Sequence, residues 1–511
     1  MPSQTTYNWL VAFAAGFGGL LFGYEIGVIG QVLGMEVFQT DFGMTHLDAT
    51  GKRVDLPNRP YIDGWITTTF LLGCIAGAAA CSVLADRVGR KYSIMLSGLF
   101  FAVGGGLQAF AVNLGSLLAG RVFSGIAIGI ASMVVPLYIA ETAPARTRGA
   151  LTTMYQLMIT FGIFVATCVN CVIIKLVDNN SSLEWRIALG MQIVPAAGLI
   201  SLVYFIPFSP RWLAERGRHE EGLQVIAKLR GLNVFDREAV AEYHMIRACS
   251  DADKAIGDAS WSELFQGSNG KRMFIAMVNQ SLQQLTGINI IMASDTFIPG
   301  PYYSSDIFKA MGFENADTLI AFPLANTFVN FLSTFPGMWA VDRFGRKPLL
   351  VWGGLGMAIG HAGVYTFLTL SKNYQPYAWG AIISIYVFIL SFGSTWGPVV
   401  WSYQAEIFPL RVRARGTGIA TMTNWTWNAI IAFAFPQVFT ALNKQPTVYW
   451  IFFSFCIFMF VWAIVCVPET NGKTLEEIGE VFGDRVHDSE NVFSSRDRRG
   501  GNGAGKPYYA T

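Results

Sequence analysis

Twelve apolar stretches, each about as long as a membrane-spanning helix, constrain the fold of this chain more than any other feature. A helix needs about 20 mainly apolar residues to cross the hydrocarbon core of a bilayer. The charged fraction of 14% agrees with this interpretation, because soluble proteins carry about 25%. The stretches are residues 9–31, 62–84, 92–112, 115–138, 150–174, 185–207, 271–297, 318–340, 348–370, 377–401, 416–438 and 446–467.

These stretches predict an all-α polytopic membrane protein with twelve transmembrane helices in two bundles of six. A polar segment with helical patterning, Arg211 to Arg272, separates the sixth stretch from the seventh. We expect an N-terminal bundle over 1–208, a cytoplasmic helical linker over 209–269, a C-terminal bundle over 270–468 and a largely disordered polar tail over 469–511.

The basic residues predict the orientation of the chain in the membrane. Most of the 36 lysine and arginine residues fall in the loops that share one side with the linker and the tail. Cytoplasmic loops carry such an excess, so both termini are expected in the cytoplasm. Two overlapping glycosylation sequons, at Asn179 and Asn180, would then lie outside, although short sequons also occur by chance.

Several classes of function find no support in the sequence. The net charge of +2 gives no reason to expect a nucleic acid partner, and the seven cysteines show no metal-binding spacing. Of the five histidines only His361 lies in an apolar stretch, and no nucleophile with a base surrounds it. We therefore expect no enzyme activity, no metal and no cofactor.

The two halves of the chain repeat their charged motifs. Asp86 to Lys91 follows the second stretch, and Asp342 to Lys347 follows the eighth with the same pattern Asp-Arg-x-Gly-Arg-Lys. A second repeat places Glu141, Pro144, Arg146 and Arg148 at the spacing of Glu406, Pro409, Arg411 and Arg413. Positive-inside anchoring accounts for the arginines but not for the repeated acids and prolines. Parallel repeats predict two bundles with the substrate between them, near the middle of the membrane.

The motifs together resemble the sugar porters of the major facilitator superfamily, most closely the fungal and plant monosaccharide–proton symporters. The resemblance covers roughly residues 8 to 482. The motifs that carry it are Asp86–Lys91, Arg121–Gly125, Pro136–Glu141, Pro210–Leu213, Gln283–Asn289, Asp342–Lys347, Trp396–Pro398 and Pro468–Glu477. The resemblance implies a monomeric, proton-coupled importer of a monosaccharide, a hexose in the first instance, in the plasma membrane.

Glu25 is the candidate proton site, because an acid inside a membrane span is energetically costly and marks a functional group with a partner. It lies about six residues from the outer end of the first stretch, and Arg121 lies about six residues from the outer end of the fourth. At 1.5 Å per residue both are about 9 Å below the outer boundary, so we expect them to pair. A static buried pair is the alternative. Related symporters carry an aspartate at this position, and their facilitative relatives carry a neutral residue.

Amides and aromatic rings at mid-span depth are the candidate sugar site. A sugar offers hydroxyls that both donate and accept, which amides match, and apolar ring faces, which aromatic side chains match. In the family the corresponding positions line the sugar pocket. The alternatives are amides that only join helices and, for Trp401, core packing. The candidates are Gln156, Gln283, Gln284, Asn289, Asn330, Trp396, Trp401, Asn424 and Trp425.

The family resemblance also implies a network of charges at the cytoplasmic end that would hold the bundles together when the site faces outward. Its candidate members are Asp86, Arg90, Glu141, Arg146, Asp342, Arg346, Glu406 and Arg415.

The chain departs from the family pattern in two places. The usual Pro-Glu-Ser-Pro-Arg motif has Phe208 in place of the acid, which would weaken the ion pair that this acid makes. Residues 293–301 interrupt the seventh stretch before Tyr302 and Tyr303, so we hypothesise an insertion, which is either translated or an artefact of the gene model or of splicing. A passive facilitator, a uronate or pentose symporter and a non-transporting sugar sensor remain alternative functions.

Overall fold

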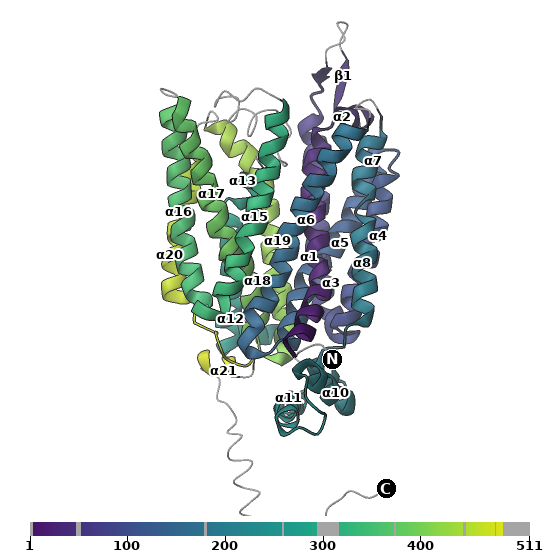
Figure 1. Cartoon of the computed structure of the whole chain (residues 1–511), viewed down its shortest axis with the longest axis vertical. Helices are drawn as coiled ribbons and strands as arrows, with labels where there is room; N and C mark the ends of the chain where they lie inside the picture. Colours follow the sequence, from purple (N-terminus) through teal and green to yellow (C-terminus); the bar gives the residue numbers. More distant parts are fainter. Residues whose placement is uncertain are drawn as a thin grey trace, which may run out of the picture.

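The computed structural model describes residues 4–47, 53–177, 181–257, 260–293, 316–371, 375–442, 446–475 and 477–483. Long helices stand side by side in two groups, which follow the two halves of the sequence (Figure 1). The first group comprises α1 (Gln4–Gly34), α3 (Arg59–Arg87), α4 (Arg90–Ala109), α5 (Leu114–Thr142), α6 (Arg148–Leu176), α7 (Leu183–Gly190) and α8 (Ile193–Phe205). The second comprises α12 (Gly267–Leu285), α13 (Ile288–Ala293), α15 (Ala316–Phe344), α16 (Arg346–Ser371), α17 (Ala378–Ser394), α18 (Trp396–Ile407), α19 (Arg413–Ala441) and α20 (Val448–Cys466).

Each of the twelve predicted apolar stretches coincides with a helix or with a broken pair of helices. Among the described residues, nine segments are long and apolar enough to cross a membrane by length and composition. The three predicted stretches outside that group form α12 with α13, α15 and α19. Polar side chains such as Gln283, Asn330 and Asn424 lie on these helices and lower their mean hydropathy.

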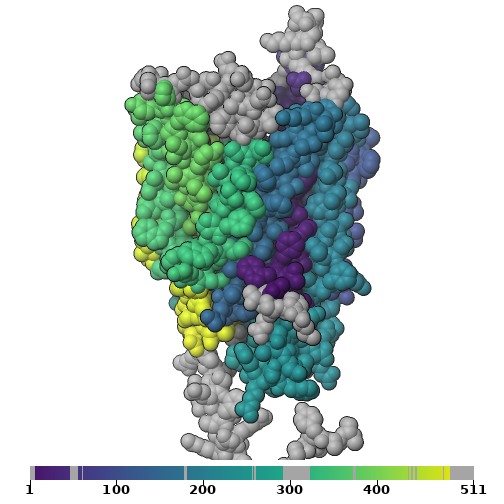
Figure 2. Space-filling model, viewed as in Figure 1, coloured from purple at the N-terminus to yellow at the C-terminus, as the bar shows by residue number. Residues whose placement is uncertain are grey.

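Short elements mark the two ends of the bundle. At one end, here called the linker end, lie α9 (Pro210–Glu215), α10 (His219–Arg230) and α11 (Arg237–Ile256), which project beyond the long helices (Figure 2). The short helices η1 (Ala145–Thr147), η2 (Trp261–Phe265), η4 (Leu410–Val412) and α21 (Ile478–Val481) complete the connections. At the opposite end, here called the far end, lie α2 (Glu36–Asp41) and the antiparallel strands β1 (Thr45–Leu47) and β2 (Arg53–Asp55). The remaining short helix is η3 (Gln375–Tyr377).

The repeated Asp-Arg-x-Gly-Arg-Lys motif forms the same turn in both halves. Gly89 separates α3 from α4 with a φ of 93°, and Gly345 separates α15 from α16 with a φ of 95°. Only glycine adopts such a left-handed conformation at little cost. Each turn brings the aspartate before it within 3.2 Å of the arginine after it, Asp86 with Arg90 and Asp342 with Arg346.

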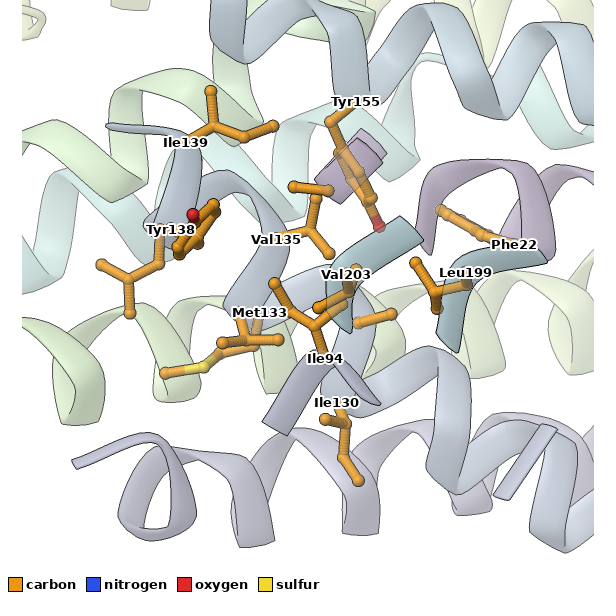
Figure 3. Close-up of a cluster of buried hydrophobic side chains, with 14 of the residues drawn as sticks. Phe22, Ile94, Ile130, Met133, Val135, Tyr138, Ile139, Tyr155, Leu199 and Val203 are labelled. Atoms are coloured by element: carbon orange, nitrogen blue, oxygen red, sulfur yellow. The ribbon is translucent and has the colours of Figure 1, made fainter. Parts of the chain in front are cut away.

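Two large apolar cores are buried, one in each half, and the first extends across the contact between the halves. Figure 3 shows part of the first core, where Tyr138, Tyr155, Val203 and Phe22 gather from four helices. Trp401 and Trp425 of the second half also pack into this core. The two bundles therefore share a buried interface.

Glycines allow α1 to approach α6 closely. A Cβ atom on Gly23 would lie 1.9 Å from the carbonyl oxygen of Ile159, which is closer than two non-bonded heavy atoms can approach. The small residue lets the two backbones touch, as is common between helices in membranes. The glycine-rich part of the first helix is therefore a packing surface as well as the carrier of Glu25.

Some predicted features fall outside the described residues. These are the sequons at Asn179 and Asn180, residues 294–301 of the suspected insertion, the pair Tyr302 and Tyr303, and the tail beyond residue 483. Ala293 is described and ends α13.

Replacing Gly23 by alanine is expected to separate α1 from α6 and prevent stable folding. The new methyl group meets backbone atoms, which cannot rotate away, so a cost of about 3 kcal/mol or more follows. The monodisperse peak in size-exclusion chromatography should be lost. Gly106→Ala in α4 is the matched control, because no atom beyond the adjoining backbone of its own helix lies within 4 Å of the added Cβ. Equal behaviour of the two variants would contradict the packing argument.

Candidate functional site

Glu25 and Arg121 form an ion pair in the interior of the first half, as the depth argument expects. Both residues are fully buried. The Arg121 Nε atom donates a hydrogen bond to the Ile66 carbonyl at 3.1 Å, and its guanidinium lies 4.6 Å from the centre of the Phe70 ring. The pair therefore joins α1 and α5 to α3.

Gln108 of α4 adds a fourth helix to this centre. Its amide donates to the Ser124 hydroxyl at 2.8 Å and interacts with the Glu25 carboxyl group. A carboxylate in a dehydrated site depends strongly on a nearby cation for its charge. Any motion that separates Arg121 from Glu25 would therefore favour proton uptake by the acid.

Five amides from α12, α13 and α19 form one hydrogen-bonded cluster in the second half. The Asn424 amide nitrogen donates to Gln280 Oε1 at 2.7 Å and to Gln283 Oε1 at 2.8 Å, and Asn424 Oδ1 accepts from Gln284 at 2.8 Å. Asn289 donates to Gln284 Oε1 at 2.6 Å. Four of these residues are predicted sugar-site residues, and the structure brings them together.

Sequence reasoning missed two members of the wider cluster, Gln280 and Gln404. Gln280 donates to Gln404 Oε1 at 2.7 Å, and Gln404 donates to the Thr421 hydroxyl at 3.2 Å. The signal for Gln280 was its helical spacing, because it precedes Gln283 and Gln284 by three and four residues on one face. No comparable signal marks Gln404, since α18 carries no other amide.

Other predicted site residues lie where the two halves meet. The Trp425 indole N–H donates to Ser132 Oγ of the first half at 3.1 Å, and its ring lies 5.1 Å from that of Phe22. Trp401 lies 5.9 Å from the Tyr155 ring, also across the halves. These two indoles are therefore part of the interface between the bundles.

Gln156 and Asn330 also reach into the interior. The Gln156 amide nitrogen lies 3.2 Å from the position that a Cβ would take on Gly397, so this residue of the first half touches α18. The buried Asn330 Oδ1 atom has no hydrogen-bond partner among the described residues. It is an acceptor that a sugar hydroxyl could satisfy.

The Trp396 side chain points away from the predicted sugar site. Its indole N–H donates to the Leu350 carbonyl of α16 at 2.8 Å, and the side chain is fully buried within the second core. The backbone carbonyl of Trp396, rather than its ring, contacts the amide cluster, where it accepts from Gln283 at 2.9 Å.

The charged residues at the linker end form one buried cluster in each half. Arg90 binds Glu141 at 3.0 Å, and Arg346 binds Glu406 at 2.8 Å, so the repeated sequence motifs produce the same pair twice. Glu215 of α9 adds a third carboxylate at 3.6 Å from Arg90. These pairs hold each bundle together internally.

Three other contacts cross between the halves at the linker end. Asp342 accepts from the backbone N–H groups of Gly149 and Ala150 at 2.8 and 2.7 Å. These amides belong to the first turn of α6, where a negative charge is favourable. Arg148 donates to the Lys473 carbonyl at 2.9 Å, and Arg413 approaches Glu141 to 3.9 Å.

The structure corrects one predicted member of the charged network. The Arg146 side chain is exposed and forms no ion pair that the described residues show. Arg415 places its guanidinium 5.3 Å from the Trp261 ring of η2 and also interacts electrostatically with Asp86, a predicted member of the network. The buried arginines of these loops are Arg148 and Arg413, because the first turns of α6 and α19 begin there and face the other half.

Phe208, which replaces the acid of the family motif, lies between cations. Lys91 and Arg218 lie 5.1 and 5.3 Å from its ring centre, and the Trp212 ring stacks on it at 5.4 Å. Cation–π contacts of this kind contribute about 0.5–1 kcal/mol each at exposed sites. Aromatic and cation–π contacts therefore stand at the position where the family motif has an acid.

Comparisons with known proteins give a consistent result. The family model described as Sugar (and other) transporter matches residues 11–482. A high-affinity hexose transporter of Saccharomyces cerevisiae is 34% identical over 92% of this chain and 80% of its own length. A probable glucose transporter of Neurospora crassa is 33% identical over 93% of this chain and 79% of its own length.

Solved structures match the helix bundle over nearly its whole length. The proton:xylose symporter XylE bound to 6-bromo-6-deoxy-D-glucose has a TM-score of 0.80, with 28% identity over 94% of this chain and all of that chain. The inward open conformation of XylE from E. coli has a TM-score of 0.65, also at 28% identity, over 93% of this chain and all of that chain. The contacts that cross between the halves close the linker end of this structure, which is consistent with its lower TM-score against the inward open form.

Replacing Glu215 by glutamine is expected to reduce the pH dependence of stability. Burial raises the pKa of Glu215 from its ordinary 4.5 to about 7, although Arg90 opposes this shift. The folded state therefore favours the neutral acid. That contribution to stability is complete below pH 4.5 and is lost as the pH rises through about 7.

The melting temperature in detergent, measured on both sides of this interval, tests the Glu215 prediction. As the pH rises, the melting temperature of the variant should fall less than that of the parent, and the two decreases should differ by a few degrees. Glu221→Gln, which removes a partner of Arg218 in the same linker, is the control and should keep the parental pH dependence. An unchanged pH dependence in Glu215→Gln would contradict the assignment.

Proposed function

The chain belongs to the family of sugar (and other) transporters, and on that premise we propose that it imports a hexose in symport with protons across the plasma membrane. The observation that carries the proton coupling is the buried ion pair of Glu25 and Arg121 in the first half. The fungal relatives are hexose and glucose transporters, and the solved relative is a proton:xylose symporter.

Glu25 acts as the proton carrier in this proposal, and Arg121 controls its charge. While Arg121 stays in contact, the carboxylate remains ionised in spite of its dehydrated surroundings. When helix motion separates the two groups, the neutral acid becomes the favoured form and a proton binds. A facilitative uniporter is the alternative within transport, and in it Glu25 and Arg121 would form a static pair that only holds the helices together.

The amide cluster of α12, α13 and α19 binds the sugar. Gln283, Gln284, Asn289 and Asn424 offer both donors and acceptors, and Gln156 approaches the cluster's helix partner α18 from the opposite half. Sugar hydroxyls can replace the amide–amide bonds without leaving a buried polar group unpaired. Contacts from both halves would let bound sugar affect the position of one bundle relative to the other.

The chain alternates between two conformations, and the structure corresponds to the one that is closed at the linker end. Support comes from the contact of Asp342 with Gly149 and Ala150 and from the poorer match to inward open XylE. We assign the linker end to the cytoplasm because basic residues gather in its loops. Both bundles come from one chain, so a monomer in the lipid bilayer is sufficient for transport.

Uptake of labelled hexoses by a yeast strain without its own hexose transporters tests the proposal. Cells that express the chain should accumulate a hexose above its outside concentration, and a protonophore should abolish accumulation. Xylose and glucuronate in the same panel examine the pentose and uronate alternatives. Entry that equilibrates but never accumulates would identify a facilitator, and specific binding without entry would identify a sensor.

Glu25→Gln is expected to abolish proton-driven accumulation while sugar still exchanges down its gradient. Glutamine keeps the size of glutamate but cannot ionise, so no proton is carried. Accumulation and counterflow exchange should be measured in the same cells. Glu25→Asp is the matched control, because it keeps the acid, and it should accumulate sugar at a reduced rate. Undiminished accumulation by the glutamine variant would reject the role of Glu25.

A further inference from the structure

His361 is a buried histidine that the proposed mechanism does not use. It lies on α16, is fully buried, and places its Nε2 atom 2.8 Å from the Thr286 carbonyl oxygen. A carbonyl oxygen only accepts hydrogen bonds, so Nε2 carries the proton and donates. The Nδ1 atom has no partner among the described residues, which agrees with a neutral ring that is protonated at Nε2 alone.

The bond from His361 is made at the break between α12 and α13. Helix α12 ends at Leu285 and α13 begins at Ile288. Gly287, between them, has a φ of 81°, and a Cβ on it would lie 2.9 Å from the Phe452 ring. The backbone at the break is therefore fixed by a glycine conformation and by a close aromatic neighbour.

The last carbonyl groups of a helix need hydrogen-bond donors from outside the helix. At this break a separate side chain provides the donor for each carbonyl described below. The Thr286 hydroxyl donates to the Gln283 carbonyl at 2.7 Å and accepts from the Ile288 N–H at 3.3 Å. His361 supplies the partner for Thr286 itself. Thr286 is fully buried, and among the described residues His361 is the donor found for its carbonyl. Loss of this donor would therefore leave that carbonyl without a hydrogen bond among them, away from water.

The His361 ring is held rigidly enough to act as a support. The Phe388 ring lies 4.6 Å from its centre, and the rings of Phe452 and Tyr449 lie at 5.7 and 5.9 Å. Phe452 thus contacts both the histidine and Gly287. A ring enclosed on several sides by aromatic neighbours has little freedom to leave the Thr286 carbonyl.

We propose that His361 is a positioning residue that sets the affinity for sugar by holding the break between α12 and α13. Asn289 on α13 reaches back across this break to Gln284 on α12 at 2.6 Å. The histidine therefore fixes two amides of the cluster relative to each other without touching the sugar. This inference rests on the proposed sugar site, and it adds α16 to the helices that determine affinity.

Three substitutions at one position separate hydrogen bonding from packing. Phenylalanine keeps an aromatic ring but has no donor. Glutamine carries an N–H at about the reach of histidine Nε2, whereas the amide of asparagine is one bond shorter. We expect His361→Phe and His361→Asn to raise the KM for the transported hexose about tenfold, with the maximal rate per transporter within about twofold. His361→Gln should stay within about twofold of the parent in both.

The measurements are initial uptake rates normalised to transporter at the cell surface, and hydrogen exchange of the purified protein. Exchange at the amides of residues 286–291 should be faster in His361→Phe than in the parent or His361→Gln, and this result does not depend on transport. If the parent transports a hexose and the phenylalanine variant has the same KM, the inference about His361 is overturned while the proposed function stands. Equal impairment of the glutamine and phenylalanine variants, or unchanged exchange at the break, would do the same. If the phenylalanine variant does not reach the surface, the asparagine and glutamine variants make the comparison.

Discussion

The buried contact between Glu25 and Arg121 is the interaction on which the first half of the molecule depends. Moving a carboxylate and a guanidinium out of water costs several kcal/mol for each ion, and only close contact with further hydrogen bonds offsets this. The Ile66 carbonyl and Gln108 supply such contacts from two more helices. The close approach of α1 to α6 at Gly23 holds the helix that carries the acid in place. Tight packing and charge stabilisation are therefore one requirement, and in the proposed mechanism a helix motion that relaxes the packing would also change the charge of Glu25.

The linker end uses the same charged motif twice, but the two copies contact the opposite half in different ways. Both copies form an internal pair, Arg90 with Glu141 and Arg346 with Glu406. Asp342 also accepts from the first turn of α6, whereas the Asp86 side chain is 41% exposed beside Arg90. A carboxylate at a helix N-terminus gains from several aligned N–H groups, so this contact is sensitive to a small displacement of α6. An asymmetric contact of this kind can open without disturbing the internal ion pairs of either bundle.

The sequence was sufficient for features that follow from length and depth, and insufficient for those that depend on side-chain direction. The long apolar stretches predicted the helices, and equal depth predicted the Glu25–Arg121 pair. Trp396 lies at the predicted depth, but its indole points to α16, because rotation about the helix axis decides which side faces the cluster. Arg146 and Arg148 are two residues apart, and only the start of α6 determines that the second is buried. Gln404 belongs to the amide cluster through a partner on another helix, which no spacing within α18 reveals.

If the amide cluster is the sugar site, as proposed, its hydrogen bonds explain how one site can bind a polar ligand and still release it. In this conformation Gln283, Gln284 and Asn424 satisfy one another, so a sugar that binds these three amides exchanges hydrogen bonds with them. An exchange of this kind is nearly neutral in free energy, because a typical hydrogen bond contributes only about 0.5–1.5 kcal/mol net. Discrimination then comes from mismatch: a ligand that separates two amides and lacks a hydroxyl to replace the bond leaves a buried polar group unpaired. The cost of that error depends on how rigidly the amides are held, and so on the break that His361 supports.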